Sequence, residues 1–441
     1  MNHSTLQLFN LSTLAAAVAA IAATAAAEPR VDQNAVTLTQ DPQSRLVSVT
    51  YTLTGEPAVI TVDFQTNAVA NAETGWASIG EMNFTNTTGD VNQVVPVGEH
   101  EITWQPDKAW PDKVIKWNRF RAVVKAWATN APPDYCAVCL LTDAQIDAKK
   151  AANVTWDIPR RRYFVSADAV PGGVTNSLYK TDFLLLRKIP AAGVVWRMGV
   201  YKSAQIHKVR LTRDYYIGIF EMTGAQRGAL NGTPGTSTLP NGQQTWNALR
   251  GSSSSYPWPD AQGNPQHNVS ATAPLGVLRT RTGIDTFDFP TEAQWEYACR
   301  AGNGGWTYNQ NPPSDYHSSA KSQIQAVAWC SENWATGTGY DGTSRLHPVG
   351  QKPANAWGLY DMLGNAAEWT LDWNASYFIP ADANAVTNNP VGAISGTQKV
   401  TRGGHPSTSA DYIDMGAREG KEPGSSGRVS GWRVVCDAVA K

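Results

Sequence analysis

The 441-residue chain has little charge and no strong excess of either sign. Only 17% of its residues are Asp, Glu, Lys or Arg, and the formal net charge at pH 7 is −1. Proteins that bind nucleic acid normally carry a clearly basic surface. The one basic run here, Arg160–Arg162, is interpreted as a solvated loop. The composition therefore gives no reason to expect nucleic acid as a partner.

Long apolar runs are also scarce. The one clear example, Leu11–Ala27, is uncharged, rich in alanine and ends in three alanines before Glu28. Such a segment is typical of a cleaved export signal and is short for a membrane span, although no Lys or Arg precedes it. We expect residues 1–27 to be a signal peptide. The mature protein is then secreted, periplasmic or at the cell surface, and attached to a membrane only through an uncleaved signal.

Cysteine is scarce as well. The chain has five: Cys136, Cys139, Cys299, Cys330 and Cys436. Export permits disulfides, and an odd total leaves at least one thiol unpaired. The CAVC motif, Cys136–Cys139, is compatible with half a zinc site or a redox pair, but no second CxxC or HxxxH completes a zinc site. We interpret CAVC as a local disulfide.

Glycine (37), proline (26) and tryptophan (17) are abundant, which favours strands and ordered loops over long surface helices. Segments that alternate apolar with polar residues occur at Asn34–Gln40, Arg45–Leu53, Ala58–Thr66, Val94–Trp104 and Arg119–Thr129. Short alternating strands at this spacing predict an immunoglobulin-like β-sandwich over residues 28–130. We expect this sandwich to be a spacer or adhesion module. A proline-containing linker is expected over residues 131–182.

The C-terminal part contains one clear helix signal, Thr291–Gly302. Thr291 is a good N-cap, and Gly302 supplies a stop. Trp295, Ala298 and Cys299 fall on one face, which predicts packing against a core without any catalytic role. The segment Gly224–Gly283, rich in Gly, Ser, Pro and Asn, predicts no regular element.

Three motifs are specific when taken together. They are FPTEAQWEYACRAG (289–302), NAWGLYDMLGNAAEWTLDW (355–373) and RGG…GWRVVCD (402–437). This combination resembles the formylglycine-generating enzyme, or sulfatase-modifying factor, family over roughly Phe183–Asp437. The resemblance implies an α+β, C-type-lectin-like fold for residues 183–441. It also implies a disulfide between Cys299 and Cys436.

The motif DMLGNAAEW predicts a calcium site. Asp361 and Glu368 bracket a tight glycine turn, and hard oxygen ligands in a loop suit Ca²⁺. The resemblance places calcium on these carboxylates and on the carbonyls of Gly364 and Ala366. The alternative is that the carboxylates cap the turn without metal. A second calcium site of the family maps, with altered spacing, onto Asn333, the Trp334 carbonyl, Asp341 and the Thr343 carbonyl.

The family's oxidase converts a sulfatase cysteine to formylglycine with O₂ and Cu(I), and two thiolates after the RGG motif hold the copper. Here Thr408 and Ile413 occupy the matching positions. Soft Cu(I) binds hydroxyl oxygen poorly, and isoleucine cannot ligate a metal. We therefore expect neither copper nor formylglycine generation. His405 beside Asp411 and Asp414 remains compatible with an acid/base or metal site, against an interpretation as surface polar residues.

The window His405–Asp414 is rich in small, hydroxyl and acidic residues between the retained motifs. We predict a catalytically inactive protein whose window binds a protein or glycan, as in the retroelement-diversified proteins of this fold that it also resembles. The residues expected to form this surface are His405, Ser407, Thr408, Ser409, Asp411, Tyr412 and Asp414. The alternatives are a divergent formylglycine-generating oxidase, another metal-dependent enzyme, or a structural envelope component.

Overall fold

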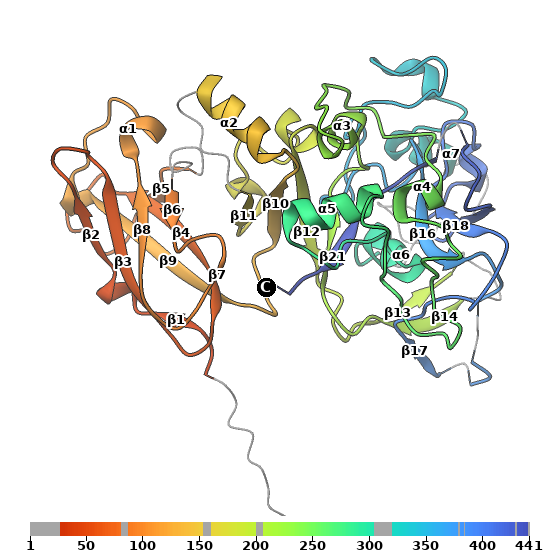
Figure 1. The fold of residues 1–441 in the computed structure, drawn as a ribbon, viewed down its shortest axis with the longest axis horizontal. Coiled ribbons are helices and arrows are strands. Elements are labelled where there is room, and N and C mark those ends of the chain that lie inside the picture. The colour runs from red at the N-terminus through yellow and green to blue at the C-terminus, as the bar shows by residue number, and fades with distance from the viewer. Residues whose placement is uncertain are drawn as a thin grey trace, which may run out of the picture.

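The computed structural model describes residues 27–80, 87–152, 160–199, 206–303, 320–377, 380–382, 384–427 and 430–439. The predicted signal peptide, except for Ala27, lies outside these ranges. The described chain is mixed α/β with sheets predominating, and no helix in it is both long and apolar enough to cross a bilayer. Figure 1 shows the N-terminal sheets at one end and the C-terminal domain at the other.

The N-terminal region consists of two antiparallel sheets that share one hydrophobic core. The first contains β1 (Arg30–Val31), β2 (Thr37–Gln40), β3 (Val47–Thr54), β6 (Thr87–Gly89) and β8 (Gly98–Trp104). The second contains β4 (Ala58–Thr66), β5 (Ala77–Ser78), β7 (Val94–Val95) and β9 (Phe120–Ala128). Phe64 and Trp104 stack inside, with ring centroids 4.3 Å apart. The predicted strands are confirmed, whereas the immunoglobulin-like assignment stays a prediction.

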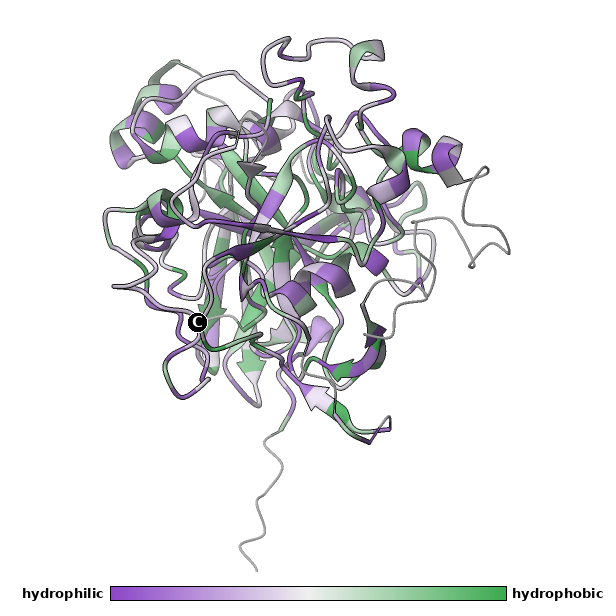
Figure 2. Cartoon of the chain, turned by 90° about the vertical axis from the view of Figure 1, so that its right-hand side faces the viewer, coloured by the Kyte–Doolittle hydropathy of each residue, from purple (hydrophilic) through white to green (hydrophobic). Residues whose placement is uncertain are grey.

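The described part of the C-terminal domain contains three sheets. A five-stranded antiparallel sheet has the order β11 (Arg161–Phe164), β10 (Tyr135–Cys139), β12 (Phe183–Ile189), β15 (Tyr215–Gly218) and β21 (Val435–Asp437). A three-stranded sheet consists of β13 (Val195–Met198), β14 (His207–Arg210) and β17 (Val386–Asn388). A four-stranded sheet has the order β19 (Arg418–Lys421), β18 (Lys399–Arg402), β16 (Ala367–Trp373) and β20 (Ser430–Gly431). In Figure 2 the hydrophobic residues lie mainly along the inner strands.

The segment expected to be a linker is part of this domain. Residues 131–182 contain β10, β11 and α2 (Asp143–Ala152), and β10 pairs with β11 on one side and β12 on the other. Flanked by strands, every residue of β10 is buried. β10 and β11 lie between the N-terminal sheets and the other C-terminal strands (Figure 1). The backbone N–H of Tyr163 donates to the Asn92 side chain at 3.2 Å, so the two regions touch here.

The remaining helices are short. They are α1 (Pro106–Ala109), α3 (Gly224–Leu230), α4 (Trp246–Arg250), α5 (Pro274–Thr282), α6 (Glu292–Arg300) and α7 (Ala320–Val327). The predicted helix after Thr291 is confirmed as α6: Thr291 and Gln294 form a capping box, and Trp295 is fully buried. The segment Gly224–Gly283, for which the sequence indicated no particular secondary structure, contains α3, α4 and α5.

Candidate ligand-binding cleft

The predicted binding window belongs to the loop that joins β18 to β19. These strands are antiparallel, and Arg402 is paired with Arg418 across them. Gly403 and Gly404 begin the loop with φ values of +91° and +77°, a region that favours glycine. A Cβ at Gly403 would lie 3.2 Å from the Met362 carbonyl oxygen. The double glycine therefore serves both the turn and a close approach to the DMLGN segment.

The side chain of Arg402 fixes the inner face of this loop. It is buried and donates to Glu292 Oε1 at 2.9 Å and to Glu296 Oε2 at 2.6 Å, both on α6. It also donates to the carbonyls of Met415 (2.8 Å) and Gly416 (3.0 Å), where the chain returns. Burial would lower the pKa of Arg402, but Glu296 and the nearby Tyr377 and Glu292 hold it well above the usual range. The two α6 carboxylates are four residues apart, a spacing that places them on one helix face.

Glu332 holds the outer half of the loop. Its carboxylate accepts hydrogen bonds from Ser331 Oγ (2.9 Å), Ser409 Oγ (2.7 Å) and the Ala410 N–H (3.1 Å). Burial alone would raise the pKa of Glu332, but these hydrogen bonds lower it to about 2. Lys321, in the first turn of α7, pairs with Asp411 at 2.7 Å. The loop is therefore fixed from two sides, and neither Glu332 nor Lys321 was marked by any sequence motif.

The loop divides the predicted residues into an inner and an outer set. Ile413 is 2% exposed and packs in the core, whereas its neighbour Tyr412 is 76% exposed. A Cβ at Gly404 would lie 2.9 Å from Ile413 Cγ1 and 3.7 Å from Thr408 Cβ, so Ile413 and Thr408 both border Gly404. At the two positions where the family resemblance places copper thiolates, the chain therefore has a hydrocarbon and a hydroxyl.

His405 is partly buried and contacts its own loop. The imidazole Nδ1 of His405 accepts from the backbone N–H of Ser407 at 3.2 Å. The backbone N–H of His405 donates to Thr408 Oγ1 at 3.2 Å. Burial lowers the pKa of His405. Within the described ranges, no hydrogen bond joins His405 to Asp411 or Asp414. The acid/base arrangement that the sequence left open is thus not assembled.

Residues from the loop and from the adjoining strands line a cleft of about 390 Å³. The lining consists of Ala367, Thr401, Gly404, Asp411, Tyr412, Asp414, Ala417, Arg418 and Glu419. Asp414 is 5% exposed, and its Oδ1 accepts from the Gly416 N–H at 2.6 Å. Burial raises the pKa of Asp414. Three residues of the predicted surface, Asp411, Tyr412 and Asp414, are therefore brought together around one opening.

The first predicted calcium site fits the ion in part. Asp361 is buried; its Oδ2 accepts from the Gly350 N–H at 2.6 Å, and its Oδ1 has no partner among the described residues. Burial raises the pKa of Asp361 to about 6. Glu221, which accepts from the Ala366 N–H at 2.7 Å, is also buried, and burial together with Asp361 raises its pKa well above the usual range. A cation at this point would stabilise both carboxylates.

Glu368 is used differently. It pairs with Arg433 at 2.7 Å and accepts from Trp295 Nε1 at 2.7 Å, so its charge is already balanced. Among the described residues, no group of three or more Asp, Glu, His or Cys side chains is placed to hold a metal. Calcium at Asp361 would thus need carbonyl or water oxygens as well, and the Gly364 and Ala366 carbonyls stay predicted ligands.

The residues of the second predicted calcium site serve their own turns. Asn333 Oδ1 accepts from the Cys330 N–H at 2.9 Å, and its Nδ2 donates to the Ala328 carbonyl at 2.9 Å. Asp341 accepts from the Thr343 N–H at 2.9 Å and from Ser344 Oγ at 2.5 Å. This second site stays a prediction.

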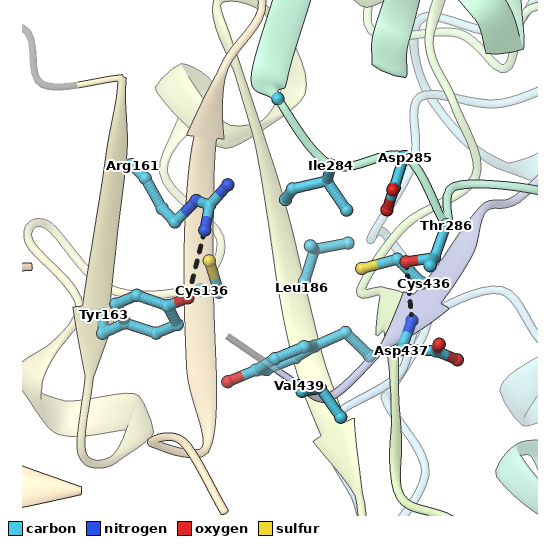
Figure 3. Close-up of a pocket in the computed structure, with 12 residues that line it drawn as sticks. Cys136, Arg161, Tyr163, Leu186, Ile284, Asp285, Thr286, Cys436, Asp437 and Val439 are labelled. Atoms are coloured by element: carbon cyan, nitrogen blue, oxygen red, sulfur yellow. Dashed lines mark hydrogen bonds between the residues drawn. The ribbon is translucent and has the colours of Figure 1, made fainter. Parts of the chain in front are cut away.

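The cysteines require two corrections, because all five are buried free thiols. Cys136 and Cys139 are three residues apart on β10, so their side chains point to opposite faces and form no local disulfide. The predicted Cys299–Cys436 disulfide is also absent. Cys299 Sγ lies 3.9 Å from the Met362 carbonyl in one core cluster, whereas Cys436 belongs to another. Figure 3 shows Cys436 and Cys136 lining a common small pocket, with Leu186 beside them.

The fold and the cleft together define a mixed α/β domain in which long loops, set between antiparallel strands, carry the exposed polar and aromatic groups. The chain belongs to the family of the sulfatase-modifying factor enzyme 1-like domain, whose model matches residues 188–438.

Curated relatives are similar to part of the chain. The formylglycine-generating enzyme of Bos taurus is 38% identical over 151 residues, which are 34% of this chain and 38% of the relative. That of Thermomonospora curvata is 31% identical over 156 residues, 34% of this chain and 49% of the relative. The chain therefore matches between about two fifths and one half of the length of these relatives.

Solved structures are similar as well. Treponema denticola variable protein 1 has 23% identity and a TM-score of 0.42, over 58% of this chain and 95% of that one. PvdO from Pseudomonas aeruginosa has 19% identity and a TM-score of 0.41, over 58% and 94%. Likeness at this level says nothing about what the present chain binds.

Proposed function

We propose that this protein is an exported, catalytically inactive member of its family that binds a protein or glycan through the loop His405–Asp414. In this proposal the N-terminal sheets form an immunoglobulin-like spacer. The observation that carries the proposal is the position of Tyr412, which is 76% exposed beside the cleft while Ile413 anchors the same loop in the core.

The anchoring of the loop supports recognition. Arg402 and Glu332 hold its inner and outer parts, so little conformational entropy is lost when a partner binds. Exposed tyrosines are common among the residues that dominate binding energy at interfaces. A fixed loop that presents a tyrosine over a polar cleft has the character of a contact surface.

Binding is tested with the full chain and a matched pair of variants. Tyr412→Ala removes the aromatic group at the cleft, and Tyr340→Ala makes the same change at a tyrosine that is 37% exposed and does not line the cleft. Partners captured by the wild type are identified by mass spectrometry, and glycans by array; each is then measured with purified components. We expect Tyr412→Ala to weaken binding at least tenfold and Tyr340→Ala to leave it unchanged. Equal binding by all three proteins would refute the proposal.

A second candidate is a divergent formylglycine-generating oxidase, because the curated relatives at 31–38% identity carry that name. The observation against it is the pair Thr408 and Ile413, which offers no thiolate. Incubation of the protein with a CxPxR peptide, Cu(I) and O₂, followed by mass measurement, separates the candidates. A formylglycine product establishes the oxidase and overturns the proposal that the protein is inactive.

We also propose one structural Ca²⁺ at Asp361. The unpartnered Oδ1 of Asp361 and the neighbouring buried Glu221 support it, because a divalent cation would balance two carboxyl groups that burial otherwise keeps from ionising.

A further inference from the structure

The small sheet of β13, β14 and β17 carries positive charge on its outward side. Arg197 of β13 is paired with Lys208 of β14, and Arg210 follows two positions later on β14. Paired residues and alternate residues of a strand share one side of a sheet. Val209, between Lys208 and Arg210, is fully buried in the core. Arg197, Lys208 and Arg210 therefore form a basic face that points outward.

The cations of the basic face are not balanced by acidic side chains. Arg197, Lys208 and Arg210 form no ion pair with any residue that the structure describes. Lys208 Nζ instead donates to the side-chain oxygen of Asn384, on the segment that leads into β17, at 3.1 Å. The face therefore keeps its charge.

Two carboxylates close to these strands in the sequence serve backbone groups. Asp214, which follows β14, accepts from the N–H groups of Ala191 and Ala192 at 2.9 Å each. Asp382, which precedes β17, accepts from the Asn384 N–H at 2.8 Å. Both acids stabilise turns, and neither pairs with the basic face.

The same separation of charge is present in the sequence. Between Asp182 and Asp214 the chain has no Asp or Glu and seven Lys or Arg residues, although its overall net charge is −1. Of these, Arg187 and Lys188 pair with Asp134 outside the segment. Neighbouring cations repel one another, and a local excess of one sign on a nearly neutral protein attracts an anionic partner.

Exposed apolar side chains beside the cations favour a bilayer as that partner. Val194 and Val195 are each 42% exposed, and Val195 is paired with Arg210 on the basic face. The boundary between lipid head groups and acyl chains accepts cationic and apolar side chains together. A hydrated acidic polymer offers partners to the cations alone.

The position of the sheet in the molecule supports the same partner. Figure 1 shows β13, β14 and β17 along the lower edge of the C-terminal domain and β1 at the lower edge of the N-terminal sheets. β1 begins at Arg30, three positions after the apolar segment Leu11–Ala27. A bilayer that receives this segment therefore meets the molecule on the side of the basic sheet.

We propose that the basic face docks on a bilayer that contains anionic phospholipids. The cations of the face lie against the lipid phosphates, and the two exposed valines reach the boundary below them. This inference goes beyond the proposed function, because it does not involve the loop His405–Asp414. It also adds a membrane contact that does not depend on an uncleaved signal.

The test measures binding of the mature chain, which begins at Glu28 once the predicted signal is removed, to sedimented vesicles. Vesicles of mixed phosphatidylglycerol and phosphatidylcholine are compared with vesicles of phosphatidylcholine alone. Polyglutamate and heparin represent acidic proteins and acidic glycans. Arg197→Gln/Lys208→Gln removes two cations of the face, and Arg197→Lys/Lys208→Arg keeps both charges at the same positions. Lys113→Gln/Lys116→Gln removes two exposed lysines of the N-terminal region as the matched control.

The expected result is saturable binding to the anionic vesicles by the wild type, by Arg197→Lys/Lys208→Arg and by the lysine control. Each cation near an anionic surface contributes about fivefold to affinity, so Arg197→Gln/Lys208→Gln should bind at least tenfold more weakly. Added salt should weaken binding by the wild type. Arg197→Gln alone, at an exposed position, should lose about fivefold, which keeps the test valid if the double variant does not fold.

Four outcomes overturn the inference. They are equal binding to anionic and neutral vesicles, no binding to anionic vesicles, unchanged affinity in the glutamine variants of the face, and an equal loss in the lysine control. Binding of polyglutamate or heparin without binding of vesicles also overturns it, and assigns the face to an acidic polymer. Failure of the proposed function is a separate result, namely unchanged partner binding by Tyr412→Ala.

Discussion

The two regions of the molecule are stabilised in different ways. In the described part of residues 28–130, the buried polar side chains are those of Thr61 and Thr87, and the core consists of aliphatic and aromatic groups. The C-terminal domain buries whole arginines, and Arg250, Arg402 and Arg433 are each paired with a carboxylate.

The difference follows from how each region satisfies its backbone. Long, regular strand pairs such as β4 with β9 hydrogen-bond their own peptide groups. The irregular loops of the C-terminal domain lack such partners, so buried side chains take their place. Arg402, for example, donates to two loop carbonyls. Buried charge in this domain holds loops in position. Substitutions that remove such a charge should therefore destabilise the C-terminal domain more than loss of an exposed ion pair destabilises the N-terminal region.

The largest loss of folding stability is expected from Arg402→Met. It removes the cation that Glu292 and Glu296 share and leaves each carboxylate with one other arginine, Arg418 and Arg300. Breaking a buried pair typically costs about 3–5 kcal/mol, and these remaining pairs place the expected loss at the lower end, about 3 kcal/mol. The same change at Arg45, whose pair with Asp107 is half exposed, should cost under about 1 kcal/mol. Denaturant unfolding of both variants measures the difference. Similar losses in the two variants would mean that the regions do not differ as described.

The next largest effect on stability should distinguish two neighbouring residues of the loop, Ile413 and Tyr412. Ile413→Ala creates a cavity in the core and should cost about 2–4 kcal/mol. Tyr412→Ala, at the adjacent exposed position, should change stability by less than about 0.5 kcal/mol while weakening binding. Unfolding and binding measured on both variants test this division. A large loss of stability in Tyr412→Ala would show that the ring also supports the fold.

Calcium should reverse the way in which folding stability depends on pH through Asp361. The raised pKa of Asp361 means that, without metal, its contribution to stability is full below about pH 4 and declines as pH rises through about 6. Since Ca²⁺ competes with this proton, calcium should stabilise the protein more at pH 7 than at pH 5. At pH 7, with Ca²⁺ in hundredfold excess over Kd, the stabilisation should be about 2.7 kcal/mol. Thermal melting with calcium or chelator checks this. Asp361→Asn should abolish the response, and a response retained in that variant would place the ion elsewhere.

The smallest effect concerns Glu332. Its depressed pKa stabilises the loop above about pH 4.5, and this contribution is lost as pH falls towards about 2. Because the carboxylate is largely exposed, only local loosening is expected. Hydrogen exchange at the Ala410 amide should be faster in Glu332→Gln than in the wild type at neutral pH. Unchanged exchange would assign the anchoring of the outer loop to Lys321 and the core contacts.

Sequence periodicity revealed the regular parts of this fold. The N-terminal strands alternate clearly, and α6 has both a capping residue and an apolar face. β10 was missed because all of its residues are buried, so its sequence shows no alternation. α3 was missed although Thr223 and Gln226 form a capping box, because the helix is short and lies in a glycine-rich segment.

The candidate site was predictable in outline only. The RGG motif and the polar window located the loop, and the same motif located Thr408 and Ile413. The residues that hold the loop are distant in sequence: Glu332 bonds to Ser409 across 77 positions, and Glu296 bonds to Arg402 across 106. Contacts between such distant residues follow from the folded arrangement and leave no local pattern.

The pairing of Arg402 with Arg418 has a further consequence for engineering. Because the ends of the loop are joined in a sheet and its inward residues fill the core, the outward positions Ser407 and Tyr412 are free to vary. A combinatorial library at these two positions should retain the melting temperature of the parent across most members. The domain would then serve as a display scaffold, on which new specificities are selected without redesign of the fold.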